Sequence, residues 1–342
     1  MIELKNESLV FTFPEIHPKA YLKISFKRTL RIPDDENLYP LPPSLGNFPI
    51  EHVDDFPKNL PEKWIEHGGV MFPMYQSEAM WIDFESEFIP EHKTKYPFAV
   101  KIATGKINVI TGEYWTDSLS KQPQDYLVVP GQPWIDGYCI EKGVIRQFVA
   151  MPLGDGYSAE AQITGQEGTG GLQIIVYPMK LESFVQRWPE IPAQDDEDMD
   201  TPTFYRVSRR PDMVLAPGGR MRQEIYKDEF DHSEWELSTC SRCFAHMANS
   251  QMWKKITGKY PPTTPPTAKE YNQSGLPWFD YYSDHIPLAG AEDFGALESI
   301  SSLGKKKRQA PLRDNTSFSP KNILSLFKRR KRSNQVREWK NG

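Results

Sequence analysis

Proline is the residue that most limits the architecture of this chain, because 30 of its 342 residues are proline. That is nearly twice the usual fraction of about 5%. Proline lacks a backbone N–H and has a fixed φ angle, so it interrupts helices and central strands. The chain is therefore expected to fold into short elements joined by many turns, not into long helices.

Alternation of apolar and polar residues predicts β-strands through most of the chain. Leu22, Ile24 and Phe26 alternate with polar neighbours, which is the period of a half-buried strand. A Thr-Gly pair at 104–105 lies between two apolar runs and predicts a β-hairpin. Further strands are expected at 80–85, 125–129, 144–151 and 172–177, and a short helix at 179–188.

Two later helices carry capping signals. Asn249 or Ser250 can begin a helix that ends before Gly258. Thr267 and Glu270 have the spacing of a capping box for a second helix.

With 18 Phe, 15 Tyr and 9 Trp available for a core, we expect a single α+β, β-rich domain over residues 1–300. Its core is predicted to be sandwich-like or a distorted barrel, with a few short helices and long proline-rich loops. Residues 189–202 are rich in acidic residues and proline and are expected to form a solvated loop. Residues 301–342 are expected to form a flexible basic tail, with a short amphipathic helix near 320–332.

Charge divides the chain into two parts. The net charge is −5, but residues 305–342 hold 13 basic and two acidic residues, a balance of +11. Residues 1–304 hold 28 basic and 44 acidic residues, a balance of −16. Because phosphates repel an acidic body, we expect no sequence-specific binding of nucleic acid.

The tail contains two basic clusters, Lys305–Arg308 and Lys328–Arg332. Between them Ser319 can cap a helix and Pro320 can take its first position. Three interpretations are open: contact with the nuclear import machinery, contact with an anionic membrane surface or a partner, or a solvated tail held to the acidic body.

Hydropathy and cysteine content bear on location. The most apolar stretch, residues 171–179, is much shorter than the roughly 20 residues that span a bilayer, so no transmembrane segment is expected. The first residues lack the apolar region of a signal peptide, and three cysteines do not make a disulfide framework. We therefore expect a cytoplasmic protein that is not secreted, and the nucleus is the alternative location.

One group of residues has the spacing of half a zinc site. Cys240 and Cys243 form a C-x-x-C pair with His246 close by. A complete site needs four ligands, and the apolar residues that follow favour a buried strand in which cysteines act as small hydrophobic residues. No metal and no cofactor are therefore expected, and the zinc half-site is the alternative.

Three residues are candidates for proton transfer, although no catalytic motif surrounds them. His67 precedes two glycines, and His232 lies among acidic residues. Glu160 belongs to the glycine-rich segment 154–171, whose spacing departs from that of a phosphate-binding loop. We expect that segment to be a loop between two strands.

Arginines next to glycines suggest a ligand site. Gly218 and Gly219 would allow close approach of a ligand, and Arg220 and Arg222 alternate, so they share one face of a strand and could bind a carboxylate or phosphate. The alternative is an edge strand whose arginines pair with the acidic body.

Two further polar positions join the predicted ligand-binding set. Arg146 and Gln147 interrupt an otherwise apolar strand, where polar groups must be paired or functional. Trp278 and Asp280 lie in an aromatic run of a kind used for stacking and hydrogen bonding, although ordinary core packing is the alternative.

Several long strings resemble blocks of an uncharacterised protein family found chiefly in filamentous fungi, with bacterial relatives. The resemblance covers most of residues 25–285 and implies no established activity, cofactor or catalytic residue. Members of that family often carry a label as integral membrane proteins, which the hydropathy of this chain contradicts. The strings include RTLRIPDD (28–35), LPPSLGNFPI (41–50), MYQSEAMW (74–81), PWIDGYC (133–139), IRQFVAMPLGDGYSAEAQITG (145–165) and LAPGGRMRQEIY (215–226).

Taken together, these features favour a non-catalytic binding or scaffold module that recognises a partner protein or a small polar ligand. The alternative is a hydrolase or transferase that acts on an anionic small molecule, with Arg220 and Arg222 binding the charge. His67, His232 or Glu160 would then transfer the proton.

Overall fold

The computed structural model describes residues 1–58, 60–166, 168, 170–190, 213–283, 285–309, 312 and 315–327. The predicted acidic loop lies outside these residues from position 191 onward, and so does the second basic cluster, Lys328–Arg332. Strands contain 39% of the residues and helices contain 18%, so the predicted β-rich α+β class with a sandwich-like core is confirmed. None of the described helices has the length and apolar character needed to cross a bilayer.

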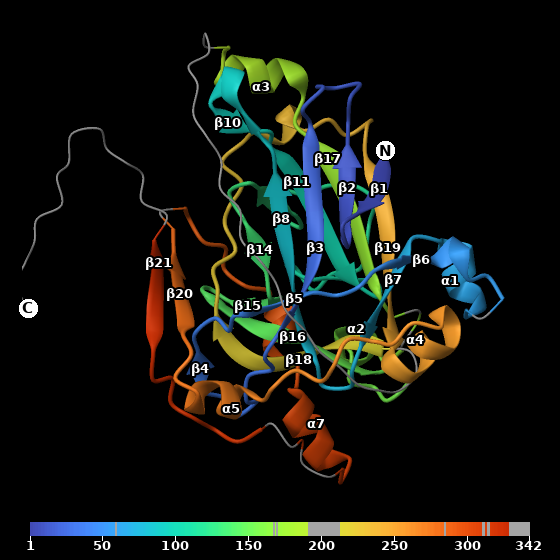
Figure 1. Cartoon of the computed structure of the whole chain (residues 1–342). Coiled ribbons are helices and arrows are strands. Elements are labelled where there is room, and N and C mark those ends of the chain that lie inside the picture. The colour runs from blue at the N-terminus through green and yellow to red at the C-terminus, as the bar shows by residue number, and fades with distance from the viewer. Residues whose placement is uncertain are drawn as a thin grey trace, which may run out of the picture.

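The strands form two facing layers that belong to one large, mainly antiparallel sheet (Figure 1). The first layer contains β1 (Ile2–Lys5), β2 (Ser8–Thr12), β3 (Tyr21–Thr29), β5 (Ser44–Asn47), β8 (Ala79–Ser86) and β14 (Trp134–Ile135). The second contains β6 (Glu51–His52), β7 (Val70–Met74), β19 (Ser241–Asn249), β17 (Leu172–Pro178), β11 (Phe98–Thr104), β12 (Ile107–Asn108) and β13 (Leu127–Val129).

The main core fills the space between these layers. Phe26 of β3 stacks on Phe72 of β7 with ring centroids 4.8 Å apart, and Phe13 faces Phe98 of β11 at 6.0 Å. The alternation predicted for β3 is confirmed, because Leu22 and its apolar alternates are fully buried. The predicted hairpin at 104–105 is also present, as the turn between β11 and β12.

A third group of strands joins the two layers at one end. It contains β15 (Gly137–Glu141), β16 (Val144–Pro152), β18 (Met213–Arg222) and β4 (Leu38–Tyr39). β16 meets the first layer where Phe148 pairs with Met80, and β18 meets the second where Met213 pairs with Met247. The arginines predicted to bind a ligand lie on β16 and β18, so this junction positions them.

The helices are short, as the proline content predicted. Asn249 Oδ1 accepts the N–H of Gln251 at the start of α4, and Thr267 and Glu270 form the predicted capping box of α5. The glycine-rich segment differs from the prediction of a loop, because the Ser158 side chain caps a one-and-a-half-turn helix there. The helices are α1 (Glu62–His67), α2 (Ala159–Thr164), α3 (Leu181–Arg187), α4 (Ser250–Thr257), α5 (Ala268–Gln273), α6 (Glu292–Gly295) and α7 (Ile300–Lys306). Two further short strands, β9 (Phe88–Ile89) and β10 (Thr94–Lys95), pair with each other.

The helix predicted near 320–332 is wrong over residues 323–327, which form strand β21 (Ile323–Phe327) parallel to β20 (Trp278–Tyr282). A helix of two turns is only marginally stable in water, and pairing with a strand that is already fixed supplies backbone hydrogen bonds instead. The anchor of β20 is Trp278, which is fully buried.

The segment before β21 is not a flexible tail, since it packs on the body. The Asn315 side chain accepts the Asp34 N–H at 2.7 Å, and Phe318 packs on Trp278 with ring centroids 5.0 Å apart. The first basic cluster also contacts the body, because Lys306 pairs with Glu298 at 2.6 Å and the Lys307 ammonium lies 4.4 Å from the Tyr157 ring centroid.

Candidate functional site

The three predicted ligand-binding arginines are each paired with a carboxylate. Arg146 lies 3.3 Å from Glu36, Arg220 contacts Glu141, and Arg222 lies 3.6 Å from Asp280. Pairs of this kind neutralise the guanidinium charge and contribute little to stability where they are exposed. The structure therefore favours the alternative stated above, in which these arginines balance the acidic body.

Three other residues of the predicted ligand-binding set, Gln147, Gly218 and Gly219, contact the protein's own backbone. Gln147 is fully buried, where its amide oxygen accepts the Ile32 N–H at 3.1 Å and its amide nitrogen donates to the Leu30 carbonyl at 2.9 Å. A Cβ at Gly219 would lie 2.4 Å from the Pro33 carbonyl oxygen, and one at Gly218 would lie 3.0 Å from that of Gln147. The absence of a side chain at these two glycines therefore allows neighbouring backbone segments, and not a ligand, to pack closely against them.

The proton-transfer candidates lie apart from one another and from the arginines. The His67 ring stacks on Phe244 at 4.4 Å, at the end of α1. The Glu160 carboxylate accepts the Gly168 N–H at 3.2 Å in the α2 region, and His232 Nε2 lies 3.1 Å from the Leu119 carbonyl oxygen. No described pocket is lined by two of these three side chains.

The C-x-x-C pair is divided between solvent and core. Residues three apart on an extended chain point to opposite sides, so Cys240 is exposed while Cys243 is buried. Burial raises the pKa of Cys243 to about 12 and lowers that of His246 to about 4. Within the described residues, no three His, Cys, Asp or Glu side chains are grouped to hold a metal ion.

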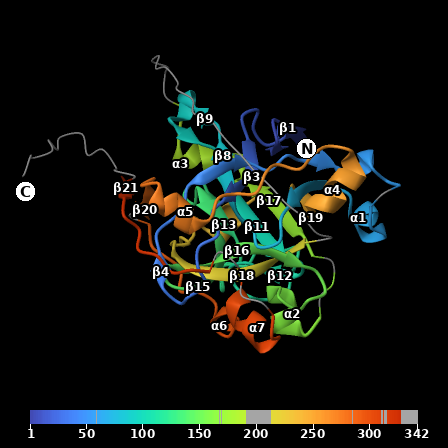
Figure 2. The same ribbon diagram turned by 60° about the horizontal axis from the view of Figure 1, so that its bottom comes forward.

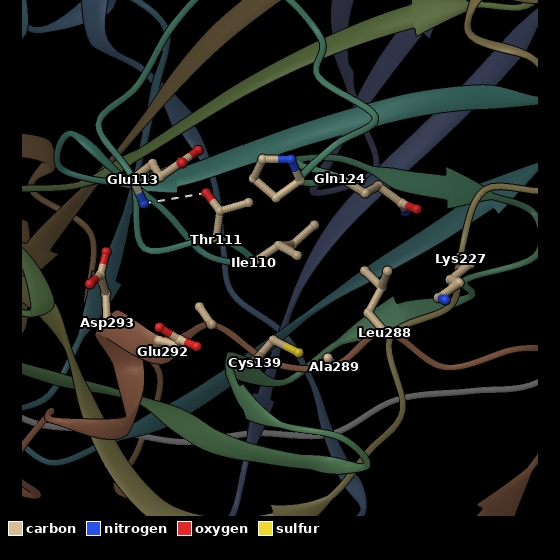
Figure 3. A pocket seen from close by; sticks show the side chains of 13 residues that line it. Ile110, Thr111, Glu113, Gln124, Cys139, Lys227, Leu288, Ala289, Glu292 and Asp293 are labelled. Atoms are coloured by element: carbon tan, nitrogen blue, oxygen red, sulfur yellow. Dashed lines mark hydrogen bonds between the residues drawn. The ribbon is translucent and has the colours of Figure 1, made fainter.

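A pocket of about 500 Å³ opens elsewhere, beside strand β15 (Figure 3). Its apolar middle includes Ile110 and the buried Cys139, together with Leu288. The complete lining is Ile110, Thr111, Glu113, Pro123, Gln124, Cys139, Lys227, Leu288, Ala289, Gly290, Ala291, Glu292 and Asp293.

One extended segment, residues 286–291, builds a wall of this pocket. Its Leu288 N–H donates to the Ile225 carbonyl at 2.6 Å, and its Ala291 N–H donates to the Cys139 carbonyl at 3.0 Å. A Cβ at Gly290 would lie 2.3 Å from the Glu141 backbone nitrogen, so only glycine allows the segment to lie this close to β15.

A second glycine fixes the acidic end. Gly112 has a φ of 76°, and a Cβ there would lie 2.9 Å from the Cβ of Asp293. The turn at 110–113 therefore approaches the start of α6 closely. As a result, three carboxylates, those of Glu113, Glu292 and Asp293, gather at one end of the pocket (Figure 3).

The opposite end of the pocket carries a positively charged side chain, that of Lys227. Lys227 and Gln124 lie across the apolar middle from the three carboxylates (Figure 3). The Cys139 sulfur is in the middle, and burial raises its pKa to about 12, so it is a neutral thiol at physiological pH. The pocket thus has an anionic end, an uncharged apolar middle and a cationic end.

None of the residues predicted from the sequence lines this pocket. The signal that could have indicated it is the run Leu288-Ala-Gly-Ala-Glu-Asp293, in which small residues precede two acids. Small residues allow close backbone approach, but their partner at 110–113 lies far away in the sequence and is identified only by the fold.

A second groove, of about 290 Å³, is lined by two of the predicted residues, His67 and Cys243. His67 lines it together with His52, Asp54 and Arg242. Arg242 is already engaged, since it donates to Asp117 at 2.9 Å and to Gln173 at 2.5 Å. Its lining therefore offers less unpaired charge than the larger pocket.

Comparison of the chain with protein-family models, with curated proteins and with solved structures finds no match. The functional argument therefore depends on the geometry of the pocket.

Proposed function

We propose that this chain is a non-catalytic binding module for a small amphipathic molecule that carries an ammonium group at one end. The observation that supports the proposal is the polarised pocket of about 500 Å³, a volume within the range of small-molecule sites. Glu113, Glu292 and Asp293 would receive the ammonium group.

The apolar middle defines the body of the ligand. Ile110, Leu288 and the alanines on either side of Gly290 offer no charge there, so they favour a methylene chain or a ring. Each buried methylene contributes about 0.8 kcal/mol. Lys227 at the far end would bind a carboxylate, so ligands with charges at both ends should bind best.

The same lining supports binding without catalysis. Cys139 is the thiol of the pocket lining, and because burial raises its pKa to about 12 it is not activated for attack. The His67, His232 and Glu160 side chains lie outside the lining. The alternative of an enzyme acting on an anionic substrate draws no support from the arginines, because each is paired with a carboxylate.

Calorimetric titration with three probes tests this proposal. We expect 6-aminohexanoate to bind more tightly than hexylamine, and hexanoate to bind most weakly, because three carboxylates outnumber one lysine. Binding should weaken as salt concentration rises. Absence of binding by both amine probes, or preference for hexanoate, would contradict the proposal.

A further inference from the structure

The ribbon formed by β20 and β21 ends in an open edge. β20 is held on its inner side, where Leu41 and Phe279 exchange backbone hydrogen bonds of 2.8 and 2.9 Å. β21 lies on its outer side, and Figures 1 and 2 both place β21 at the outside of the molecule. In the part of the chain that the structure describes, no strand lies beyond β21.

Within the described residues, this exposed edge strand lacks two of the usual means of protection, charged side chains and proline. Ile323, Leu324 and Leu326 are 42%, 48% and 44% exposed, and the strand contains no charged residue and no proline. Exposed edge strands normally carry such residues, because unpaired backbone groups recruit other strands. A ribbon of two strands is also only marginally stable by itself, so a third strand would stabilise it.

The register shows which backbone groups are open. The Trp278 N–H donates to the Asn322 carbonyl at 2.8 Å, which directs the backbone of residue 322 toward β20. Because backbone groups alternate along a strand, those of Ile323, Ser325 and Phe327 point away from β20. Ser325 is therefore the central residue of the open edge.

We propose that β21 pairs with β21 of a second copy of this chain, antiparallel and centred on Ser325. This register places Ile323 opposite Phe327 and Leu324 opposite Leu326, so every apolar residue meets an apolar residue. The two Ser325 residues would exchange both of their backbone hydrogen bonds. The pair has two-fold symmetry and closes, because each copy offers one open edge.

Charge supports the choice of a second copy. The chain continues from Phe327 directly into Lys328–Arg332, five basic residues. A second copy brings an acidic body, with a balance of −16 over residues 1–304, and such a body attracts a basic run that follows the pairing strand in the sequence. Association should therefore weaken as salt concentration rises.

Sedimentation of the full chain over a range of concentrations tests the proposal. We expect a concentration-dependent dimer that Ser325→Pro weakens tenfold or more, because proline removes the outward N–H of each copy and leaves the hydrogen bonds to β20. Ser325→Ala is the matched control, since it keeps that N–H and should leave dimerisation within twofold of the original.

A second variant guards against misfolding of the proline variant. Leu326→Lys replaces a side chain that is exposed in the single chain, so the monomer should fold normally while the dimer is lost. A chain that stays monomeric to about 100 μM, far above the micromolar range of specific association, would overturn the proposal. So would a dimer that Ser325→Pro leaves intact, or a monomer that binds phosphatidylserine vesicles through β21.

Discussion

Arg28 and Glu78 form a salt bridge inside the protein, with the Arg28 Nε 2.6 Å from the Glu78 Oε1 and both side chains at most 1% exposed. The pair joins β3 to the start of β8. Arg28 also donates to the Thr263 carbonyl at 3.1 Å, and Glu78 accepts the Tyr75 N–H at 3.0 Å. The pair thus fixes the loop after α4 against the first layer.

Removal of one partner should strongly destabilise the folded protein, because the other partner remains buried and charged. We expect Glu78→Gln to lower the free energy of unfolding by about 3–5 kcal/mol. The exposed pair Lys23–Glu85, at 2.9 Å, provides the control, and Glu85→Gln should cost less than about 1 kcal/mol. Urea denaturation measures both values, and equal losses would show that burial of the pair is not the cause.

Asp136 should make stability depend on pH. Burial raises its pKa to about 7, although hydrogen bonds from Trp134 and Gln223 oppose the shift. Because the folded protein then holds a proton that the unfolded chain releases, this residue's contribution is present below its unfolded pKa of about 4 and is lost as the pH rises to 7.

The test is Asp136→Asn, which stays neutral at every pH. We expect the variant to be more stable than the original protein at pH 8, by up to about 4 kcal/mol, and close to it at pH 4. Urea denaturation at the two pH values measures the difference. A difference that does not change with pH would show that Asp136 does not titrate in this range.

The charges at the two ends of the pocket should act on different probes. Asp293→Asn should weaken the binding of both 6-aminohexanoate and hexylamine about fivefold. This is the change in affinity that corresponds to roughly 1 kcal/mol from one exposed charge. Lys227→Met should weaken the binding of 6-aminohexanoate and of hexanoate but should leave the binding of hexylamine unchanged. Glu182→Gln, on the exposed face of α3, is the control and should change none of them. Equal effects of Lys227→Met on all three probes would contradict the assigned orientation.

Gly290 should be required for the pocket wall. In Gly290→Ala the added Cβ would lie 2.3 Å from the Glu141 nitrogen, so we expect a loss of stability of about 1–3 kcal/mol and loss of probe binding. Gly295→Ala is the control, because no atom lies within 4 Å of its added Cβ. Thermal unfolding and calorimetry measure the two effects. Unchanged probe binding in Gly290→Ala would separate this segment from the site.

Local patterns predicted the elements whose stability is local. The capping residues Asn249 and Thr267 have their predicted partners, because a cap and the helix that it begins lie within four residues. The alternation around Ile24 also predicted strand β3 correctly, because alternate residues of a strand point to opposite faces and one face of β3 is buried.

Where partners come from distant segments, sequence patterns were less informative. Arg220 and Arg222 have the spacing of an anion site, but the fold brings Glu141 and Asp280 to them. Residues 323–327 have a helical apolar pattern, yet β20, some 45 positions earlier, pairs with them as a strand. Pairing energy of this kind depends on proximity that no local window contains.

The sequence by itself determined that this chain makes short elements, that strands predominate, and that an acidic body precedes basic clusters, because proline, alternation and charge act through local geometry and simple electrostatics. Tertiary structure alone decided that the turn at Gly112 lies against Asp293, that Cys139 is buried between the carboxylate end of the pocket and Lys227, and that β21 is an open edge among the described strands. These relationships depend on contacts between segments that are far apart in the chain, and such contacts form only when the core has assembled.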